Sequence, residues 1–172
     1  MKTNGTWTRS RAAFVAVLAL AAVLPGCGGD SDTPTAPPVT QPPQLVRTLL
    51  AQGSFDLIGV GEAVRQGIQI DYIRHEFTTS GTGAVEVNAD WTFANSQMGI
   101  VVGRGSCSFA QIDAALAGNA AACPEAGGTL ATSKPARVNI GVLPQNTYTL
   151  VILNPNDRSE SGNYQVYQQS IQ

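Results

Sequence analysis

Beyond residue 44 the chain is a series of short runs in which apolar and polar residues alternate, separated by turn residues. The clearest run is 84–93, and its apolar positions are Val85, Val87, Ala89, Trp91 and Phe93. Alternation with a period of two is typical of a strand with one buried face. We therefore expect a strand here, with Trp91 in the core; the alternative is an exposed platform for a sugar ring.

Similar alternation predicts further strands at 49–58, 68–77, 98–102, 137–143, 147–153 and 164–171. Within 68–77 the apolar positions change from even numbers, such as Tyr72, to odd numbers, such as Ile73 and Phe77. We expect a β-bulge near Tyr72 to restore one inner face. Many short strands without a long helical pattern predict an all-β, antiparallel two-sheet sandwich over residues 45–172.

One short helix is predicted at residues 109–116. Ser108 followed by Gln111 resembles a capping box, and Gly118 can end the helix. The apolar residues on one face are Phe109, Ile112 and Leu116. Because so short a helix is unstable alone in water, packing or a covalent link must hold it.

Residues 1–26 have the features of a bacterial export signal, with basic residues at the start and an uncharged apolar run at 12–24. A spanning helix needs about 20 apolar residues, which disfavours the alternative of a retained membrane anchor. The run ends in Leu24-Pro25-Gly26-Cys27, which resembles the lipobox of bacterial lipoproteins. The resemblance implies cleavage after Gly26, diacylation of the Cys27 thiol and acylation of the new amino group. Several acyl chains anchor a protein firmly, at about 0.8 kcal/mol per buried CH₂.

The charge of the chain changes with this cleavage. The formal net charge is -2, but three of the ten basic residues and none of the twelve acidic ones precede Cys27, which leaves the mature chain at -5. An acidic protein is a poor partner for nucleic acid. Gly28 is not the aspartate that retains lipoproteins in the inner membrane of diderm bacteria. The resemblance therefore implies an exported, lipid-anchored protein, at the outer membrane or cell surface in a diderm.

Residues 27–44 predict a disordered tether between the lipid and the domain. Five prolines fall within ten positions, at Pro34, Pro37, Pro38, Pro42 and Pro43. Such a stretch has no apolar face to bury and extends as polyproline II at about 3.1 Å per residue. A proline-rich recognition motif is the alternative.

Cys107 and Cys123 flank the predicted helix. Export places them in an oxidising compartment, and Cys27 is committed to lipid, so an even pair remains. We predict a disulfide between them, worth about 3 kcal/mol for a loop of roughly 17 residues. Two free thiols are the alternative, and two cysteines are too few for a cysteine-only metal site. We expect no metal and no cofactor.

Residues 76–167 resemble the bacterial pre-peptidase C-terminal domain, a jelly-roll-like β-sandwich found on secreted enzymes and surface proteins. The matching stretches are Phe77-Thr78-Thr79-Ser80-Gly81, Gly83-Ala84-Val85-Glu86-Val87, Asp90-Trp91, Leu143-Pro144-Gln145-Asn146-Thr147-Tyr148-Thr149-Leu150-Val151-Ile152 and Ser161-Gly162-Asn163-Tyr164-Gln165-Val166. The resemblance implies the fold and not an activity, because these are mostly core and turn positions. Asn146 stands where a glycine is usual, and residues 97–100 replace an acidic strand, so no calcium or ligand site is carried over.

Catalytic chemistry has little support in the sequence. His75 is the sole histidine, and Ser80 near it lies in no nucleophile elbow, so we expect His75 on a strand surface or edge. The acidic residues near it have the spacing of outward strand positions rather than of a glycosidase pair; they are Asp71, Glu76, Glu86 and Asp90. We predict no catalytic residues and no enzyme.

Residues 154–162 form the most polar loop. Its oxygen-bearing side chains are Asn154, Asn156, Asp157 and Glu160. Calcium takes six to eight oxygens, and Arg158 adds a positive charge in the middle, so hairpin-turn chemistry is the favoured interpretation over a calcium site.

The sequence as a whole favours a non-catalytic module of the cell envelope that binds carbohydrate or protein. A structural accessory domain of an envelope complex is the first alternative, and a hydrolase the second. Folding alone explains two segments least, the insertion 108–124 and the loop 154–162. Since loops carry most recognition sites, we expect any ligand to bind there.

Overall fold

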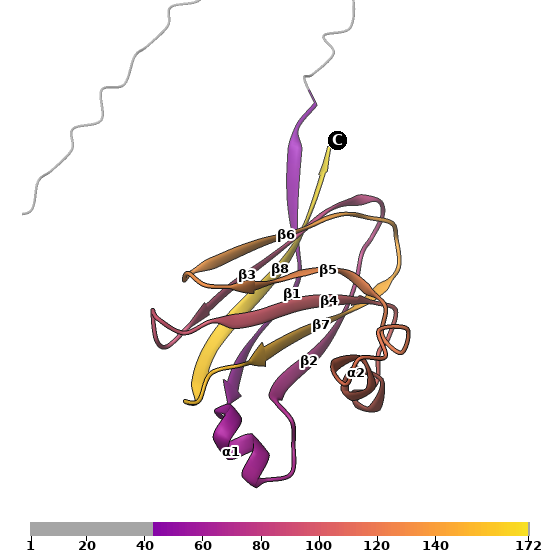
Figure 1. Ribbon diagram of the computed structural model, residues 1–172. Helices are drawn as coiled ribbons and strands as arrows, with labels where there is room; N and C mark the ends of the chain where they lie inside the picture. The colour runs from indigo at the N-terminus through magenta and orange to yellow at the C-terminus, as the bar shows by residue number, and fades with distance from the viewer. Residues whose placement is uncertain (1–42, 172) are drawn as a thin grey trace, which may run out of the picture. The chain divides into compact units, whose positions relative to one another are not determined.

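The computed structural model describes residues 43–171, which form two facing antiparallel sheets of four strands and two short helices (Figure 1). The strands are β1 (Leu45–Leu57), β2 (Asp71–Thr78), β3 (Gly83–Trp91), β4 (Met98–Arg104), β5 (Glu125–Ala131), β6 (Ala136–Leu143), β7 (Thr147–Asn154) and β8 (Glu160–Ile171), and the helices are α1 (Val60–Arg65) and α2 (Phe109–Leu116). The predicted all-β sandwich is confirmed. The predicted signal peptide, Cys27 and the tether up to residue 42 lie outside the described residues.

The strand order is that of a jelly roll. One sheet has the order β1-β8-β3-β6 and the other β2-β7-β4-β5. The chain therefore crosses between the sheets at every connection except β4 to β5, which are neighbours in one sheet. This arrangement of eight antiparallel strands is the double-sheet solution that a jelly roll provides.

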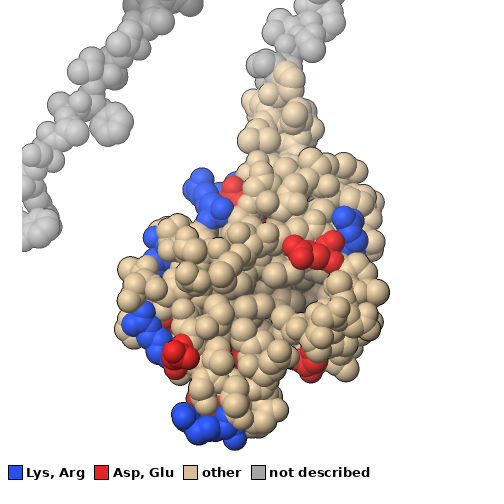
Figure 2. Space-filling model, in the orientation of Figure 1, with Lys and Arg blue, Asp and Glu red and all other residues tan. Residues whose placement is uncertain are grey.

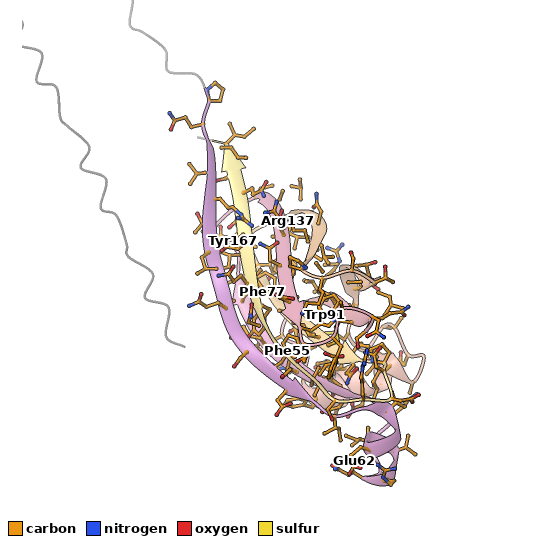
Figure 3. The ribbon with its side chains drawn as sticks, turned by 90° about the vertical axis from the view of Figure 1, so that its left-hand side faces the viewer. Phe55, Glu62, Phe77, Trp91, Arg137 and Tyr167 are labelled. Carbon is orange, nitrogen blue, oxygen red and sulfur yellow. A yellow bond between two sulfur atoms is a disulfide. The ribbon has the colours of Figure 1, made fainter. Side chains whose placement is uncertain are left out.

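The core lies between the sheets and follows the alternation of the sequence. In β3 the inward residues are nearly inaccessible, with Val85 and Val87 at 0% and Trp91 at 2% relative exposure. Figure 3 shows Trp91 together with Phe55 and Phe77, which belong to the same buried cluster. Phe93 was predicted to share this face, and that prediction is wrong. Because β3 ends at Trp91, Phe93 lies in the following loop and is 41% exposed.

The predicted bulge near Tyr72 is absent. The pairing of β2 with β7 runs without a register shift from Asp71 to Thr78. The even-numbered apolar residues Ile68 and Ile70 precede the strand, and Tyr72 packs with a small cluster on the outside of the sheet. The change of parity in the sequence therefore marks the start of the strand and a second apolar face, not a bulge.

Two elements were not predicted, α1 and β5. Helix α1 is six residues long and buries only Ala63. Strand β5 contains Gly127 and Gly128, which weaken its strand signal. The backbone oxygen of Ile100 lies 2.7 Å from where a Cβ on Gly128 would be, so the close approach of β4 requires a glycine there.

The first and last strands bring the two ends of the described chain together. Leu45 in β1 pairs with Ile171 in β8, and α1 follows the other end of β1 (Figure 1). At about 3.3 Å per residue, the 13 residues of β1 separate Leu45 from α1 by roughly 40 Å.

Candidate functional site

The segment between β4 and β5 is held rigidly at both ends. The Ser108 backbone N–H donates to Gln111 Oε1 at 2.8 Å, and the Gln111 N–H donates to Ser108 Oγ at 3.3 Å, which confirms the predicted capping box. Cys107 and Cys123 form the predicted disulfide, with their Cα atoms 5.7 Å apart. The cap and the bridge together fix the position of α2.

Helix α2 packs on the outer face of the β2-β7-β4-β5 sheet. Ile112 is 3% exposed and contacts Val151 and Cys107 in a small cluster separate from the main core. Tyr72 and Leu116 lie at the edge of this cluster. The helix thus covers part of a sheet face that would otherwise be apolar and open to water.

A cleft of about 530 Å³ lies between α2 and the segment that joins α1 to β2. Its lining includes Ile68, Asp71, Tyr72, Phe109, Asp113 and Leu116. We call it the α2 cleft. Its volume is in the range of pockets that hold small ligands or single side chains of a partner.

Two aromatic rings form one wall of the α2 cleft. The ring centroids of Tyr72 and Phe109 are 5.9 Å apart, and the planes are tilted by 36°. Phe109 is 59% exposed, and Ile68, which also lines the cleft, is 41% exposed. The α2 cleft therefore offers open aromatic surface.

The Tyr72 hydroxyl is fixed by α2. It donates to Asp113 Oδ1 at 2.7 Å and also lies 3.2 Å from the carbonyl oxygen of Phe109. Burial, and then the Asp113 carboxylate, raise the pKa of the Tyr72 phenol. The phenol stays neutral at pH 7 and serves as a hydrogen-bond donor to the carboxylate.

The charge of the α2 cleft is negative. Asp71 and Asp113 line it, and neither takes part in an ion pair among the described residues. Asp71 Oδ2 accepts a hydrogen bond from the Ile58 N–H at 2.8 Å. No lysine or arginine is among the described residues that line the cleft.

The arginine that contacts the aromatic wall already has a carboxylate partner. Arg74 lies with its guanidinium carbon 5.8 Å from the Phe109 ring centroid, donates to the carbonyl of Cys107, and forms an ion pair with Glu76. Figure 2 shows a largely uncharged face on which acidic and basic residues are scattered. The negative charge of the α2 cleft is therefore local rather than part of a broad acidic surface.

A smaller hollow lies on the other side of α2. Its volume is about 190 Å³, and it is mostly apolar, with Val101, Ile112, Ala115, Val151 and Leu153 in its lining. Leu116 lines this hollow as well as the α2 cleft. A hollow therefore lies along each side of helix α2.

His75 lies away from the α2 cleft. It sits on β2, an edge strand, as the sequence led us to expect. The side chain is half-buried, and its ring is 5.7 Å from the ring of Tyr164. This is a packing contact at the border of the sandwich.

The acidic residues considered for hydrolysis have separate partners. Glu76 pairs with Arg74, Glu86 with Arg47 at 2.5 Å, and Asp90 with Lys134 at 3.2 Å. Only Asp71 of that set lines the α2 cleft.

The polar loop 154–162 uses its side chains to join other segments. Asn154 is fully buried, and its Nδ2 donates to the carbonyls of Ile58 and Arg158 at 3.1 and 2.8 Å. Glu160 is 1% exposed and accepts hydrogen bonds from the Phe93 N–H and from Ser96 Oγ. Among residues 43–171 no three His, Cys, Asp or Glu side chains come together as they would around a metal ion. The predicted hairpin turn is wrong, because β7 and β8 belong to different sheets and this loop crosses from one sheet to the other.

The outer face of the β1-β8-β3-β6 sheet carries the second candidate surface. A hollow of about 400 Å³ there is lined by polar side chains that include Asn88, Asp90, Arg137, Asn163 and Gln165. Tyr167, labelled in Figure 3, does not provide an open aromatic platform, because the Arg47 guanidinium lies 3.7 Å above its ring centroid.

The sequence pointed to the insertion 108–124 but not to the residues that complete the site. The pattern around Tyr72 predicts a bulge, and nothing in the local pattern singles out Asp113. Asp113 lies on the polar side of the predicted helix. Its role follows only once β2, which is remote in sequence, is known to lie beside that helix.

No protein family matches the chain, and no curated protein matches its sequence. Within residues 43–171 both helices are too short to cross a bilayer.

Proposed function

We propose that this protein is a non-catalytic binding module of the bacterial cell envelope, anchored by acyl chains on Cys27, and that it captures a protein partner at the α2 cleft. The observation that carries the proposal is the cleft itself. The exposed Phe109 ring and the Asp113 carboxylate, which has no ion-pair partner among the described residues, lie beside this cavity. Both belong to a helix that a cap and a disulfide hold in place. Rigid presentation of this kind lowers the entropy cost of binding.

The chemistry of the lining favours binding over catalysis. The described lining contains aspartate, glutamine, tyrosine and apolar residues, but no serine, cysteine, histidine or lysine. Nucleophilic catalysis by a hydroxyl, thiol or amine of this kind needs such a group next to a general base, and the two carboxylates in the lining already accept hydrogen bonds from the Ile58 N–H and the Tyr72 hydroxyl. His75, the candidate base of a hydrolase, packs against Tyr164 instead.

The lipid anchor rests on the Leu24-Pro25-Gly26-Cys27 motif, and its location in a diderm would be the outer membrane or cell surface. The α2 cleft adjoins Asp71, whose carboxylate contacts the end of β1 remote from Leu45. A domain tethered through Leu45 would therefore hold the cleft on its distal side. The jelly roll is also the fold implied by the resemblance to the pre-peptidase C-terminal domain, and membership of that family stays a prediction.

The test replaces residues 108–122 with a short Gly/Ser loop between the two cysteines. The main core has no member in this segment, so the sandwich should still fold, as circular dichroism would show. We expect capture of crosslinked partners from cell envelopes to fall to background. Asn88→Ala/Arg137→Ala, on the outer face of the other sheet, is the control and should keep full capture. Undiminished capture by the loop-replaced protein would contradict the proposal.

Carbohydrate binding is the second candidate, and the polar hollow at Asn88, Arg137 and Gln165 favours it. Amide and guanidinium groups can hydrogen-bond to sugar hydroxyls. Here a glycan array should show binding that Asn88→Ala/Arg137→Ala abolishes and the loop replacement leaves intact.

A further inference from the structure

We infer that the α2 cleft receives a lysine or arginine side chain of the protein partner. This inference rests on the proposed function and specifies the group that the cleft recognises. Three properties of the cleft support it: the aromatic wall, the charge and the shape.

The aromatic wall suits a cation. The Tyr72 and Phe109 rings stand 5.9 Å apart, and Phe109 is largely exposed. A cation within about 6 Å of such a ring centroid is attracted by its quadrupole, more strongly where water is excluded. The contact of the Arg74 guanidinium with the same Phe109 ring is an instance of this attraction within the protein.

The charge of the cleft selects the sign of the ligand. Asp113 uses Oδ1 to accept the Tyr72 hydroxyl, and its Oδ2 takes no hydrogen bond within the described residues. Asp71 lines the same cleft without an ion pair, whereas Arg74 is paired with Glu76. An incoming cation therefore meets uncompensated negative charge, and an anion would be repelled.

The shape of the cleft suits a long side chain with a charged end. Ile68 and Leu116 line it together with the aromatic wall, and they can contact methylene groups. Lysine and arginine bury an aliphatic stem while the charged end stays in a polar setting. A volume of about 530 Å³ accommodates such a side chain and part of the neighbouring backbone.

The experiment measures binding of blocked tripeptides to the 15N-labelled domain by NMR. The probes are acetyl-Gly-Lys-Gly-amide and acetyl-Gly-Arg-Gly-amide, and the matched control probe carries norleucine, which keeps the stem and removes the charge. We expect the cationic peptides to shift the backbone signals of 68–72 and 109–117, with weak binding at a Kd on the order of 1 mM. The norleucine peptide should bind about tenfold more weakly.

Two variants locate the interaction. Asp113→Asn removes the charge and keeps an oxygen that can accept the Tyr72 hydroxyl, and Phe109→Ala removes the exposed ring. Each should weaken binding of the cationic peptides by about tenfold. Asp56→Asn and Phe93→Ala make the same chemical changes at exposed positions outside the cleft lining and should leave the Kd unchanged.

Three results would overturn the inference: equal binding of the lysine and norleucine peptides, unchanged affinity in Asp113→Asn, or no shifts at a peptide concentration of about 10 mM. If any of these occurs while the loop replacement still abolishes partner capture, the cleft region binds a partner through a different group. If capture survives the loop replacement, the proposed function itself fails.

Discussion

At the scale of single residues, the connections between elements depend most on polar side chains that lie against buried surface. Tyr72 connects β2 to α2 through one hydroxyl, and Glu160 connects β8 to the loop after β3. Both join segments far apart in the sequence. Each can be removed by a single substitution, so each gives a direct measurement of the connection.

Tyr72→Phe should lower the free energy of unfolding by about 1 kcal/mol at pH 7, the usual worth of one hydrogen bond. The pKa of Tyr72 is raised in the folded protein, so this contribution is complete below the ordinary pKa of about 10 and is lost as the pH rises through the folded pKa. Urea unfolding of both proteins at pH 7 and above pH 10 tests this. Tyr167→Phe, whose hydroxyl contacts the partly exposed Gln165, should change stability by less than about 0.5 kcal/mol. An equal loss in both variants would contradict the assignment.

Glu160→Ala should destabilise the protein by about 2 kcal/mol, because it leaves the Phe93 N–H and the buried Ser96 hydroxyl without an acceptor. Arg158 lies 3.6 Å from the carboxylate but is partly exposed and keeps its hydration, so it adds little to the loss. Thermal and chemical denaturation provide the measurement. Asp157→Ala, in the same loop but exposed, serves as the control and should stay close to the wild type. A neutral Glu160→Ala would mean that the loop is not held by this carboxylate.

At the scale of elements, α2 is specified by its own sequence and held by the disulfide, whereas β5 forms by pairing with the neighbouring strand. The capping box and the apolar positions of α2 lie within nine residues, so the sequence predicts its bounds correctly. Strand β5 has little strand propensity and forms because β4 supplies a hydrogen-bonding partner. The predicted bulge in β2 does not form, because the Tyr72 side chain packs against α2 and not against the core.

Cys107→Ser/Cys123→Ser should lower the free energy of unfolding by about 3 kcal/mol in the chain-entropy account of a 16-residue separation. The loss should appear first in α2, whose cluster of fully buried residues contains only Cys107, Ile112 and Val151. Hydrogen exchange at 109–116 would measure this, and mass spectrometry of unreduced wild-type peptides would show the link. Protection of α2 that equals the wild type would show that packing alone holds the helix.

At the scale of the whole molecule, the jelly roll separates the proposed binding cleft from Leu45, where the proposed tether would enter the domain. The α2 cleft adjoins the end of β1 that leads into α1, and Leu45 starts the strand roughly 40 Å away. A tether that enters at Leu45 would leave the cleft accessible to a partner. The distance between the cleft and Leu45 matters for binding only if the protein is anchored through the segment before Leu45.

Cys27→Ser should release the protein from membranes and abolish labelling by a palmitate analogue, because no thiol remains for the acyl chains at the end of the apolar run. Fractionation of cells that express each form is the measurement. Cys107→Ser/Cys123→Ser should stay in the membrane fraction, which separates lipidation from a general effect of losing cysteine. Membrane retention of Cys27→Ser would contradict the anchor.

The sequence by itself determined which faces of β3 are buried, the bounds of α2, and the pairing of Cys107 with Cys123, because each depends on periodicity, capping or the number of available thiols. Only the tertiary structure decided the strand order and the α2 cleft. Tyr72 and Asp113 are 41 residues apart, and they meet because the jelly roll places β2 and β4 in the same sheet, with the helix after β4 folded over its outer face. Contacts across such a separation depend on how the strands pair, and no local pattern encodes that pairing.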